Sequence, residues 1–396
     1  MTRFSGTVSR GLRAPIIREG DDLVQIVTDT VLGASREEGI RLNDRDIVTV
    51  TEAVVARAQG NYASVDQIAA DVRQKFPGGE FSLVFPILSR NRFSILLKGI
   101  ARGAKKIHLQ LSFPTDEVGN ALVSLDQLDE HGINPWTDVL TEAQYRELFG
   151  ANPHVFTGVD YVGYFRELIE AEDCQCCIFL ANDVRESLKH SPHVLHCDIH
   201  SRRRSERLLK AAGAETVYSL DQLLTSSVEG SGYNERYGLL GSNKATEEMV
   251  KLFPRQCQDF VDALAAKLQA ETGKQIEVMI YGDGAFKDPV GGIWELADPV
   301  VSPAYTPGLD GLPNELKLKY LADNDFKELS GEELKEAIKQ HIINKEADLK
   351  GNMASQGTTP RRLTDLLGSL SDLTSGSGDK GTPIILIQGY FDNYAV

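Results

Sequence analysis

Residues 276–284, IEVMIYGDG, carry an aspartate at the end of an apolar stretch that predicts a buried β-strand over 276–281. Ligands of open α/β sheets bind at the carboxyl ends of strands. The glycines beside Asp283 would let a phosphate or a metal ion approach the backbone, and a carboxylate suits a hard cation. Lys287 and Asp288 follow closely and add a cation and a second carboxylate. We therefore predict a catalytic, metal-binding centre at Asp283, Lys287 and Asp288, with a plain Asp-Gly turn as the alternative.

Strand and helix patterns alternate along the chain, which predicts the α/β class. The β-branched run at 47–51, IVTVT, predicts a second buried strand, and residues 246–271 predict a long amphipathic helix ended by Gly273. Between about 175 and 225, alternating strands and helices indicate a parallel layer. Further predicted elements are a helix at 65–75, strands at 81–88, 107–111 and 382–388, a capping box at 124–127 and helical structure over 315–350.

The composition indicates a globular protein with more than one core. Its 396 residues exceed the ~250–300 at which single cores stop growing, and 41% hydrophobic with 25% charged residues excludes a disordered chain. The formal charge of −15 argues against partners such as duplex nucleic acid or an anionic membrane. No apolar run reaches the ~18 residues of a membrane span. The start lacks a secretory signal and the five cysteines are odd in number, so we expect free thiols and a cytoplasmic location.

Residues 376–381, GSGDKG, match the letters of a dinucleotide fingerprint in an inverted context. A predicted helix precedes them and a predicted strand follows, whereas a dinucleotide-binding fold needs a strand and then a helix. We therefore reject a Rossmann fingerprint. Two interpretations stay open: a glycine loop whose backbone N–H groups bind phosphate, or a plain linker.

Half of the eight histidines lie between 190 and 200. On a continuous strand, His196, Asp198 and His200 would share one face and offer three ligands to a transition metal. The alternative is a row of half-exposed polar residues. Cys174, Cys176 and Cys177 have no partner set, and we expect them to be structural.

Basic residues gather in two places of this acidic chain. Six lysines and arginines lie within 90–106, and four arginines lie within 202–207. Because arginine forks match phosphate and carboxylate groups, the first cluster suits an anionic substrate. The alternative is that both clusters are solvated helix faces.

Several short motifs occur in a characteristic order. They are 17–23 (IREGDDL), 46–50 (DIVTV), 54–60 (VVARAQG), 241–243 (GSN), the strand ending at Asp283, and the glycine-rich stretch 376–389. This order resembles the coenzyme F-420 gamma-glutamyl ligase family over about 10–75, 238–300 and 362–390. The resemblance implies enzymes that add glutamate to the carboxylate of a deazaflavin precursor, using GTP and divalent metal ions. It also implies a two-domain mixed α/β fold that dimerises, with the nucleotide in a groove.

The resemblance assigns roles residue by residue. Asn243 matches a nucleotide-contacting asparagine, Asp283 a metal-binding aspartate, and Arg57 replaces a nucleotide-contacting lysine. Leu240 stands where the family has a second metal-binding aspartate, and Asp160 would supply that carboxylate if the insertion lies after it. The predicted cofactor-binding residues are Arg57, Asn243, Gly376, Ser377, Gly378 and Gly381, and the predicted metal ligands are Asp283, Asp288 and Asp160.

Together these features predict a mixed α/β two-domain ligase-like fold with a large inserted α/β region. Residues 1–78 and 238–396 would form a discontinuous nucleotide- and metal-binding core, and 79–237 an inserted region that binds substrate. The predicted reaction joins glutamate or another amino acid to an anionic carboxylate acceptor through an acyl phosphate, with GTP or ATP and Mg²⁺ or Mn²⁺. We expect a homodimer. Two alternatives remain: a non-catalytic ligand-binding or regulatory protein on the same fold, and a metal-dependent hydrolase that uses the histidine-rich segment.

Overall fold

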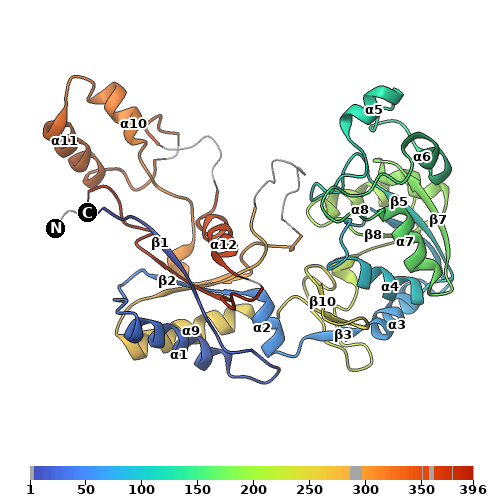
Figure 1. The fold of residues 1–396 in the computed structure, drawn as a ribbon, viewed down its shortest axis with the longest axis horizontal. Helices are drawn as coiled ribbons and strands as arrows, with labels where there is room; N and C mark the ends of the chain where they lie inside the picture. Colours follow the sequence, from blue (N-terminus) through green and yellow to red (C-terminus); the bar gives the residue numbers. More distant parts are fainter. Residues whose placement is uncertain (1–3, 286–296, 350, 356–360, 377, 396) are drawn as a thin grey trace.

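The structure is a computed structural model and describes residues 4–285, 297–349, 351–355, 361–376 and 378–395. These residues form helices and three mixed or antiparallel sheets, which confirms the predicted α/β class. Two of the sheets lie in separate lobes, joined through the small third sheet (Figure 1).

The first lobe is built on a five-stranded sheet of order β1-β14-β2-β12-β13. β2 and β12 are parallel, and the other pairs are antiparallel. The predicted strands at 47–51, 276–281 and 382–388 are β2, β12 and β14. The bounds are β1 Val8–Leu12, β2 Ile47–Thr51, β12 Glu277–Tyr281, β13 Ala304–Tyr305 and β14 Ile384–Gln388.

Helices cover both faces of this sheet because its strands are apolar on both faces. α1 (Leu23–Glu37) and α9 (Cys257–Thr272) pack on the face that includes Val48, Val278 and Leu386. α12 (Leu363–Thr374) packs on the opposite face through Leu367.

Strand register brings three distant segments to one edge of the sheet. Tyr281 at the end of β12 lies opposite Thr51 at the end of β2, and Ile384 at the start of β14 lies opposite Val50. The chain after β2, the chain after β12 and the glycine loop before β14 therefore meet at the same edge.

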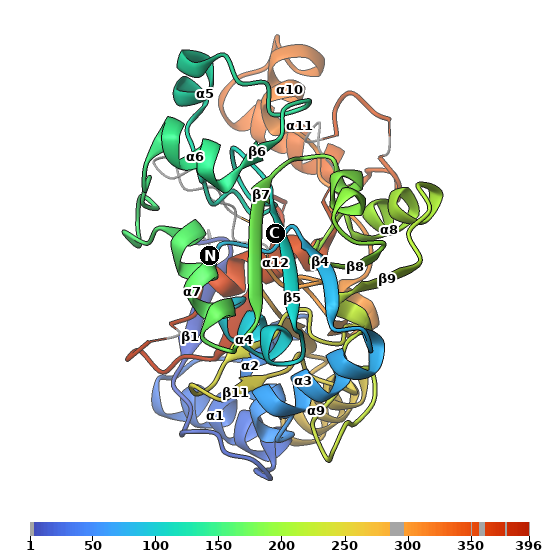
Figure 2. The ribbon, with the colours of Figure 1, turned by 90° about the vertical axis from the view of Figure 1, so that its right-hand side faces the viewer.

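The second lobe holds a six-stranded sheet of order β6-β7-β5-β4-β8-β9, all parallel except β6. Figure 2 shows β7, β5, β4, β8 and β9 side by side. The chain moves outward from β4 in one direction and then returns to add β8 and β9 on the other side, so the order reverses between β4 and β8. The bounds are β4 Glu80–Val84, β5 Lys106–Leu111, β6 Leu140–Thr141, β7 Gln175–Leu180, β8 His193–His196 and β9 Thr216–Ser219.

One face of the six-stranded sheet packs against α3, α4 and α7, and the other against η1 and α8. The predicted helix at 65–75 is α3, and the predicted capping box at Ser124 begins α5. The bounds are α3 Val65–Lys75, α4 Ser94–Arg102, α5 Leu125–His131, α6 Glu142–Phe149, α7 Tyr161–Glu170, η1 Val184–Lys189, α8 Arg202–Ala211 and η2 Leu220–Gln222.

The helix predicted over 246–271 is wrong in its first part, where the structure has a strand of the small third sheet instead. This sheet consists of β3 (Tyr62–Ser64), β10 (Asn243–Lys244) and β11 (Met249–Lys251), and the helix that follows, α9, begins only at Cys257. Pro254 lacks a backbone N–H and disfavours helical backbone at the residue before it, so the helix cannot run through this point. The core of the six-stranded lobe also includes Val65 and Phe253, which lie outside the predicted 79–237 region.

The segment predicted as helical over 315–350 is broken into short pieces. They are α10 (Leu318–Tyr320), η4 (Leu321–Asp325) and α11 (Gly331–Ile343), preceded by η3 (Pro307–Leu309). They project from the first lobe, away from the six-stranded sheet (Figure 1). Among the described helices of the whole chain, none has the length and apolar character needed to cross a bilayer.

Candidate active site

A cavity of about 970 Å³ opens at the edge of the five-stranded sheet where the three segments meet. Asp283 borders it from the end of β12, and α2 (Glu52–Ala58) borders it from the end of β2. Gly376, Gly378 and Gly381 border it from the loop before β14. The strand-end aspartate and the tail glycines, almost 100 residues apart in sequence, thus face the same space.

Arg92 reaches this cavity from the loop after β4 in the other lobe. Its Nη2 lies 2.5 Å from Asp283 Oδ1, and its Nη1 lies 2.6 Å from Asp298 Oδ1. Burial opposes the charge of Arg92, but Asp298, Asp283 and Glu52 together hold its pKa above the ordinary value. The basic cluster at 90–106 therefore contributes one of its arginines to the centre of the site.

Asp298 also fixes the backbone at Asp283. Its Oδ2 accepts a hydrogen bond of 2.8 Å from the Asp283 N–H, and Asp298 as a whole is only 3% exposed. A Cβ on Gly282 would lie 2.5 Å from that oxygen, so the position requires glycine. Because Gly282 has no side chain, the Asp298 carboxylate can approach closely and hold the backbone of Asp283 in place.

Asp372 on α12 holds the next residue in the same way. Its Oδ2 accepts a hydrogen bond of 3.0 Å from the Gly284 N–H, and a Cβ on Gly284 would lie 2.8 Å from Ser369 Cα. Burial raises the pKa of Asp372, and the nearby charge of Asp298 adds to this effect. No local sequence pattern distinguishes Asp372 from other helical aspartates, which is why sequence reasoning missed it.

Glu52, the first residue of α2, forms a second buried ion pair in the wall. Both of its carboxylate oxygens lie 2.8 Å from Lys251 Nζ on β11. Burial raises the pKa of Glu52, although Lys251 opposes the shift. Three carboxylates, Glu52, Asp283 and Asp298, thus pair with the two cations Arg92 and Lys251, and a fourth, Asp372, borders the same cavity. The oxygen set and its excess of negative charge suit a hard divalent cation.

Both ends of the glycine loop make backbone hydrogen bonds to neighbouring segments. The Gly376 N–H donates to Thr382 Oγ1 at 2.8 Å, and the two residues form an isolated β-bridge. Gly381 has φ +64°, and its carbonyl accepts from the Ala14 N–H at 3.1 Å. These contacts hold the two ends of the loop, Gly376 and Gly381, at the border of the cavity.

Arg57 and Asn243 both border this cavity. Arg57 lies in the last turn of α2 and is exposed, and no ion pair to it is found among the described residues. Asn243 lies on β10 opposite Lys251. The predicted cofactor-binding residues that the structure describes, Arg57, Asn243, Gly376, Gly378 and Gly381, are thus all brought together. Ser377, Lys287 and Asp288 lie outside the described residues.

Comparison with known proteins bears on what this site does. A family model for F420-0:gamma-glutamyl ligase matches residues 11–389 of the 396-residue chain. The chain belongs to the F420-0:gamma-glutamyl ligase family. A search of curated proteins finds no match. Membership confirms the resemblance inferred from the order of the motifs and supports a ligase enzyme.

Asp160 does not join the cavity of this ligase-family chain. It caps the amino end of α7, accepting from the Gly163 N–H at 3.2 Å, and pairs with Arg146 Nη1 at 2.8 Å. Both interactions keep its carboxylate inside the six-stranded lobe, and it is absent from the residues that border the cavity. The carboxylates near Asp283 are instead Asp298, Asp372 and Glu52. Leu240 is buried beside Arg92.

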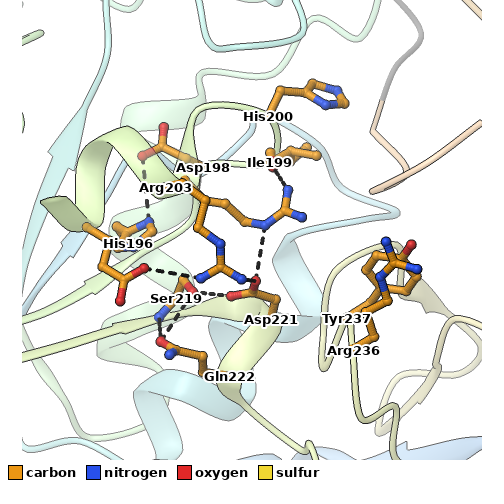
Figure 3. A network of polar contacts seen from close by, with 12 residues as sticks. His196, Asp198, Ile199, His200, Arg203, Ser219, Asp221, Gln222, Arg236 and Tyr237 are labelled. Carbon is orange, nitrogen blue, oxygen red and sulfur yellow. Dashed lines mark hydrogen bonds and ion pairs between the residues drawn. The ribbon is translucent and has the colours of Figure 1, made fainter.

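His196, Asp198 and His200, considered above as possible metal ligands on one strand face, do not lie on one face in the structure. Figure 3 shows His200 directed away from His196 and Asp198. β8 ends at His196, and the Glu117 carboxylate accepts hydrogen bonds from the backbone N–H groups of Ile199, His200 and Ser201. The chain therefore curls after His196, and the strand alternation assumed in the prediction is lost.

His196 and Asp198 nonetheless form a buried pair, with Nδ1 and Oδ2 3.6 Å apart. Burial lowers the pKa of His196 to about 4 and raises the pKa of Asp198 to about 6. Burial therefore favours the neutral form of both side chains.

The raised pKa of Asp198 predicts that the free energy of unfolding depends on pH. The folded pKa of Asp198, about 6, lies above its ordinary value of 3.8, so its contribution is fully present below about 3.8 and is lost as the pH rises through 6. We expect the stability of wild type relative to Asp198→Asn to fall by roughly 2–3 kcal/mol between pH 4 and pH 7. Urea unfolding across this range measures the difference, with the exposed Asp129→Asn as control. Parallel pH profiles for wild type and Asp198→Asn would contradict the prediction.

Proposed function

We propose that the chain is a nucleotide- and divalent-metal-dependent ligase that joins glutamate, or another amino acid, to an anionic carboxylate acceptor. The observation that carries the proposal is the single cavity shared by Asp283, the carboxylates around it, the exposed cation Arg57 and the glycine loop. These are the group types that phosphoryl transfer requires: acidic metal ligands, backbone N–H groups and a cationic side chain.

The chemistry follows from the inertness of a carboxylate toward an amine in water. An acceptor carboxylate oxygen attacks the terminal phosphorus, and the bond to the nucleoside diphosphate breaks, giving an acyl phosphate. The amino group then attacks the acyl carbon, phosphate leaves, and the nitrogen loses a proton to solvent. A Mg²⁺ or Mn²⁺ ion on the acidic wall would neutralise the phosphate oxygens.

The residues of this chain serve alignment and charge. Asp283 and Asp372 offer carboxylate oxygens toward the cavity, and Asp298 holds the backbone of Asp283. Arg57 would pair with the phosphates, and the Gly376–Gly381 loop would supply backbone donors. Arg92 balances the carboxylates at the border between the lobes and would lie beside the acceptor.

A smaller pocket of about 280 Å³ in the six-stranded lobe is the candidate binding site for the acceptor. It shares Ser89, Asn91 and Arg92 with the main cavity and also contains Arg90 and Tyr161. It is lined by residues that follow the carboxyl ends of β4 and β5, and the carboxyl ends of strands are where ligands of open α/β sheets bind. We expect the anionic acceptor to occupy this pocket, with its reacting carboxylate toward Arg92.

Nucleotide binding tests the proposal without knowledge of the acceptor. Calorimetry with GTP or ATP and Mg²⁺ should show metal-dependent binding, weakened at least about tenfold in Arg57→Gln because one charge-assisted contact is lost. Arg36→Gln, an exposed arginine at the end of α1, is the control and should bind as wild type does. Absence of binding at millimolar nucleotide would refute the ligase.

That outcome would favour the second candidate, a non-catalytic ligand-binding protein on the same fold. The observation in its favour is that Arg92 already pairs with Asp283 and Asp298. The two candidates differ in turnover: only the ligase releases nucleoside diphosphate when glutamate and a carboxylate acceptor are supplied. The expected homodimer stays a prediction.

A further inference from the structure

Three potential metal ligands converge on the six-stranded sheet, remote from the cavity. The ligand atoms of His108, Cys177 and His190 all lie within 4.8 Å of one another. Within the described part of the chain, this is the one group of three or more His, Cys, Asp or Glu residues found to converge in this way. His108 on β5 and Cys177 on β7 are direct register partners, so their side chains leave the sheet side by side.

Glu80 orients the imidazole of His108. His108 Nε2 lies 2.8 Å from Glu80 Oε1, at the first residue of β4, and Lys106 Nζ lies 3.0 Å from the same oxygen. His108 Nδ1 is buried and has no hydrogen-bond partner among the described residues. Histidines that bind a metal through one ring nitrogen commonly hydrogen-bond to a carboxylate through the other, and His108 has this arrangement.

His190, the residue directly after η1, completes the group. Its ring stacks on Phe179 with centroids 4.4 Å apart and lies 5.2 Å from the ring of His108. Zinc bonds of about 2.0–2.3 Å place tetrahedral ligand atoms roughly 3.5 Å apart. The ligand atoms now lie within 4.8 Å of one another, and because His190 is exposed, a small rotation of its side chain can bring its ring nitrogen to the shorter distance that zinc requires.

We propose that His108, through Nδ1, Cys177 and His190 bind one divalent transition-metal ion of the zinc class. Two imidazoles and a thiolate prefer such an ion to Mg²⁺ or Mn²⁺, which select oxygen ligands. The Cys177 thiol loses its proton to solvent when the sulfur–metal bond forms, and water takes the fourth position on the exposed side. Nothing in the proposed ligase reaction uses this ion.

The place of the site in the fold indicates a structural role. His108 and Cys177 are each the third residue of their strands, whereas the cavity lies beyond the carboxyl ends. The ion would tie the end of η1 to two strands of the sheet, adding to the hydrogen bond of 2.9 Å from Ser82 Oγ to the Ser187 carbonyl. It would therefore stabilise the segment that leads into β8.

Cobalt titration of the full-length protein, freed of metal by chelation, tests the site. We expect wild type to bind one equivalent of Co²⁺ with a thiolate-to-cobalt absorption band, and Cys177→Ser to lose that band. A Co²⁺ ion at Asp283 would have oxygen ligands and give no such band. Cys176→Ser is the matched control, because Cys176 lies on the opposite face against the main core and should leave the band unchanged.

Zinc competition against the bound cobalt then tests the orienting carboxylate. Glu80→Gln should weaken zinc binding by about 10–100-fold, as loss of such a hydrogen bond typically does. The matched control is Glu215→Gln, because Glu215 lies beside His193, 3.9 Å from its Nε2, outside the group. Equal weakening in both variants would contradict the role of Glu80.

Alkylation of cysteines, read by mass spectrometry of the wild-type protein, gives a result that needs no variant to fold. Zinc should protect Cys177 from alkylation by at least tenfold and leave the rate at Cys257 unchanged. A wild-type protein that shows neither a thiolate band with cobalt nor protection with zinc would overturn the proposal.

Discussion

Asp283→Asn should lower metal-dependent nucleotide turnover by at least about 10²–10³-fold while the protein stays folded, since loss of one preorganised polar group at a transition state commonly costs this much. Asparagine keeps the size of the side chain but removes the charge that would hold the cation. The backbone N–H of residue 283 keeps its hydrogen bond to Asp298. Turnover is measured as nucleoside diphosphate release at saturating Mg²⁺ or Mn²⁺, and circular dichroism verifies folding.

The control for this variant is Asp310→Asn, an exposed aspartate of the same lobe that does not border the cavity. It should turn over nucleotide at the wild-type rate. Full activity in Asp283→Asn would show that the Asp283 carboxylate has no part in the mechanism.

Arg92→Met should destabilise the protein by about 3 kcal/mol, because it removes the guanidinium that neutralises the buried carboxylate of Asp298 and the largely buried carboxylate of Asp283. Asp298 has almost no exposed side-chain surface, and Asp283 has only 16%, so solvent cannot replace the guanidinium. Urea unfolding at pH 7 measures the loss. Asp298→Asn introduced into Arg92→Met should recover part of it, since one unpaired charge is then removed.

Arg185→Met provides the comparison, because Arg185 forms an exposed ion pair with Asp183 in the same lobe. Exposed pairs are worth about 0–1 kcal/mol, so this variant should change stability little. If Arg92→Met proves as stable as Arg185→Met, the guanidinium is not a structural counter-charge of the site.

The parts of the fold that sequence predicted are those set by local chemistry. The β-branched run of β2, the apolar run of β12 and the helix after Ser64 depend on neighbours within a few residues, and all three are found. The capping box at Ser124 is equally local, since its two hydrogen bonds join Ser124 and Gln127.

The candidate site was predictable only in part, because its remaining members meet through tertiary structure. Arg92 and Asp283 are 191 residues apart, and Glu52 and Lys251 are 199 apart. No periodicity or spacing links such residues. Two local predictions failed for reasons that the structure shows: Pro254 interrupts the helix expected over 246–271, and hydrogen bonds to Glu117 bend the chain after His196.

The position of β14 has a consequence for synthesis of the chain. This strand is made last, yet it lies between β1 and β2 in the interior of its sheet. A nascent polypeptide on the ribosome can complete the six-stranded sheet once Ser219 has emerged, and most of the core of that lobe once Phe253 has emerged, well before β14. The five-stranded lobe must wait with a gap beside β2 until residue 388 emerges, and in that interval the exposed edges of β1 and β2 are open to pairing with other chains.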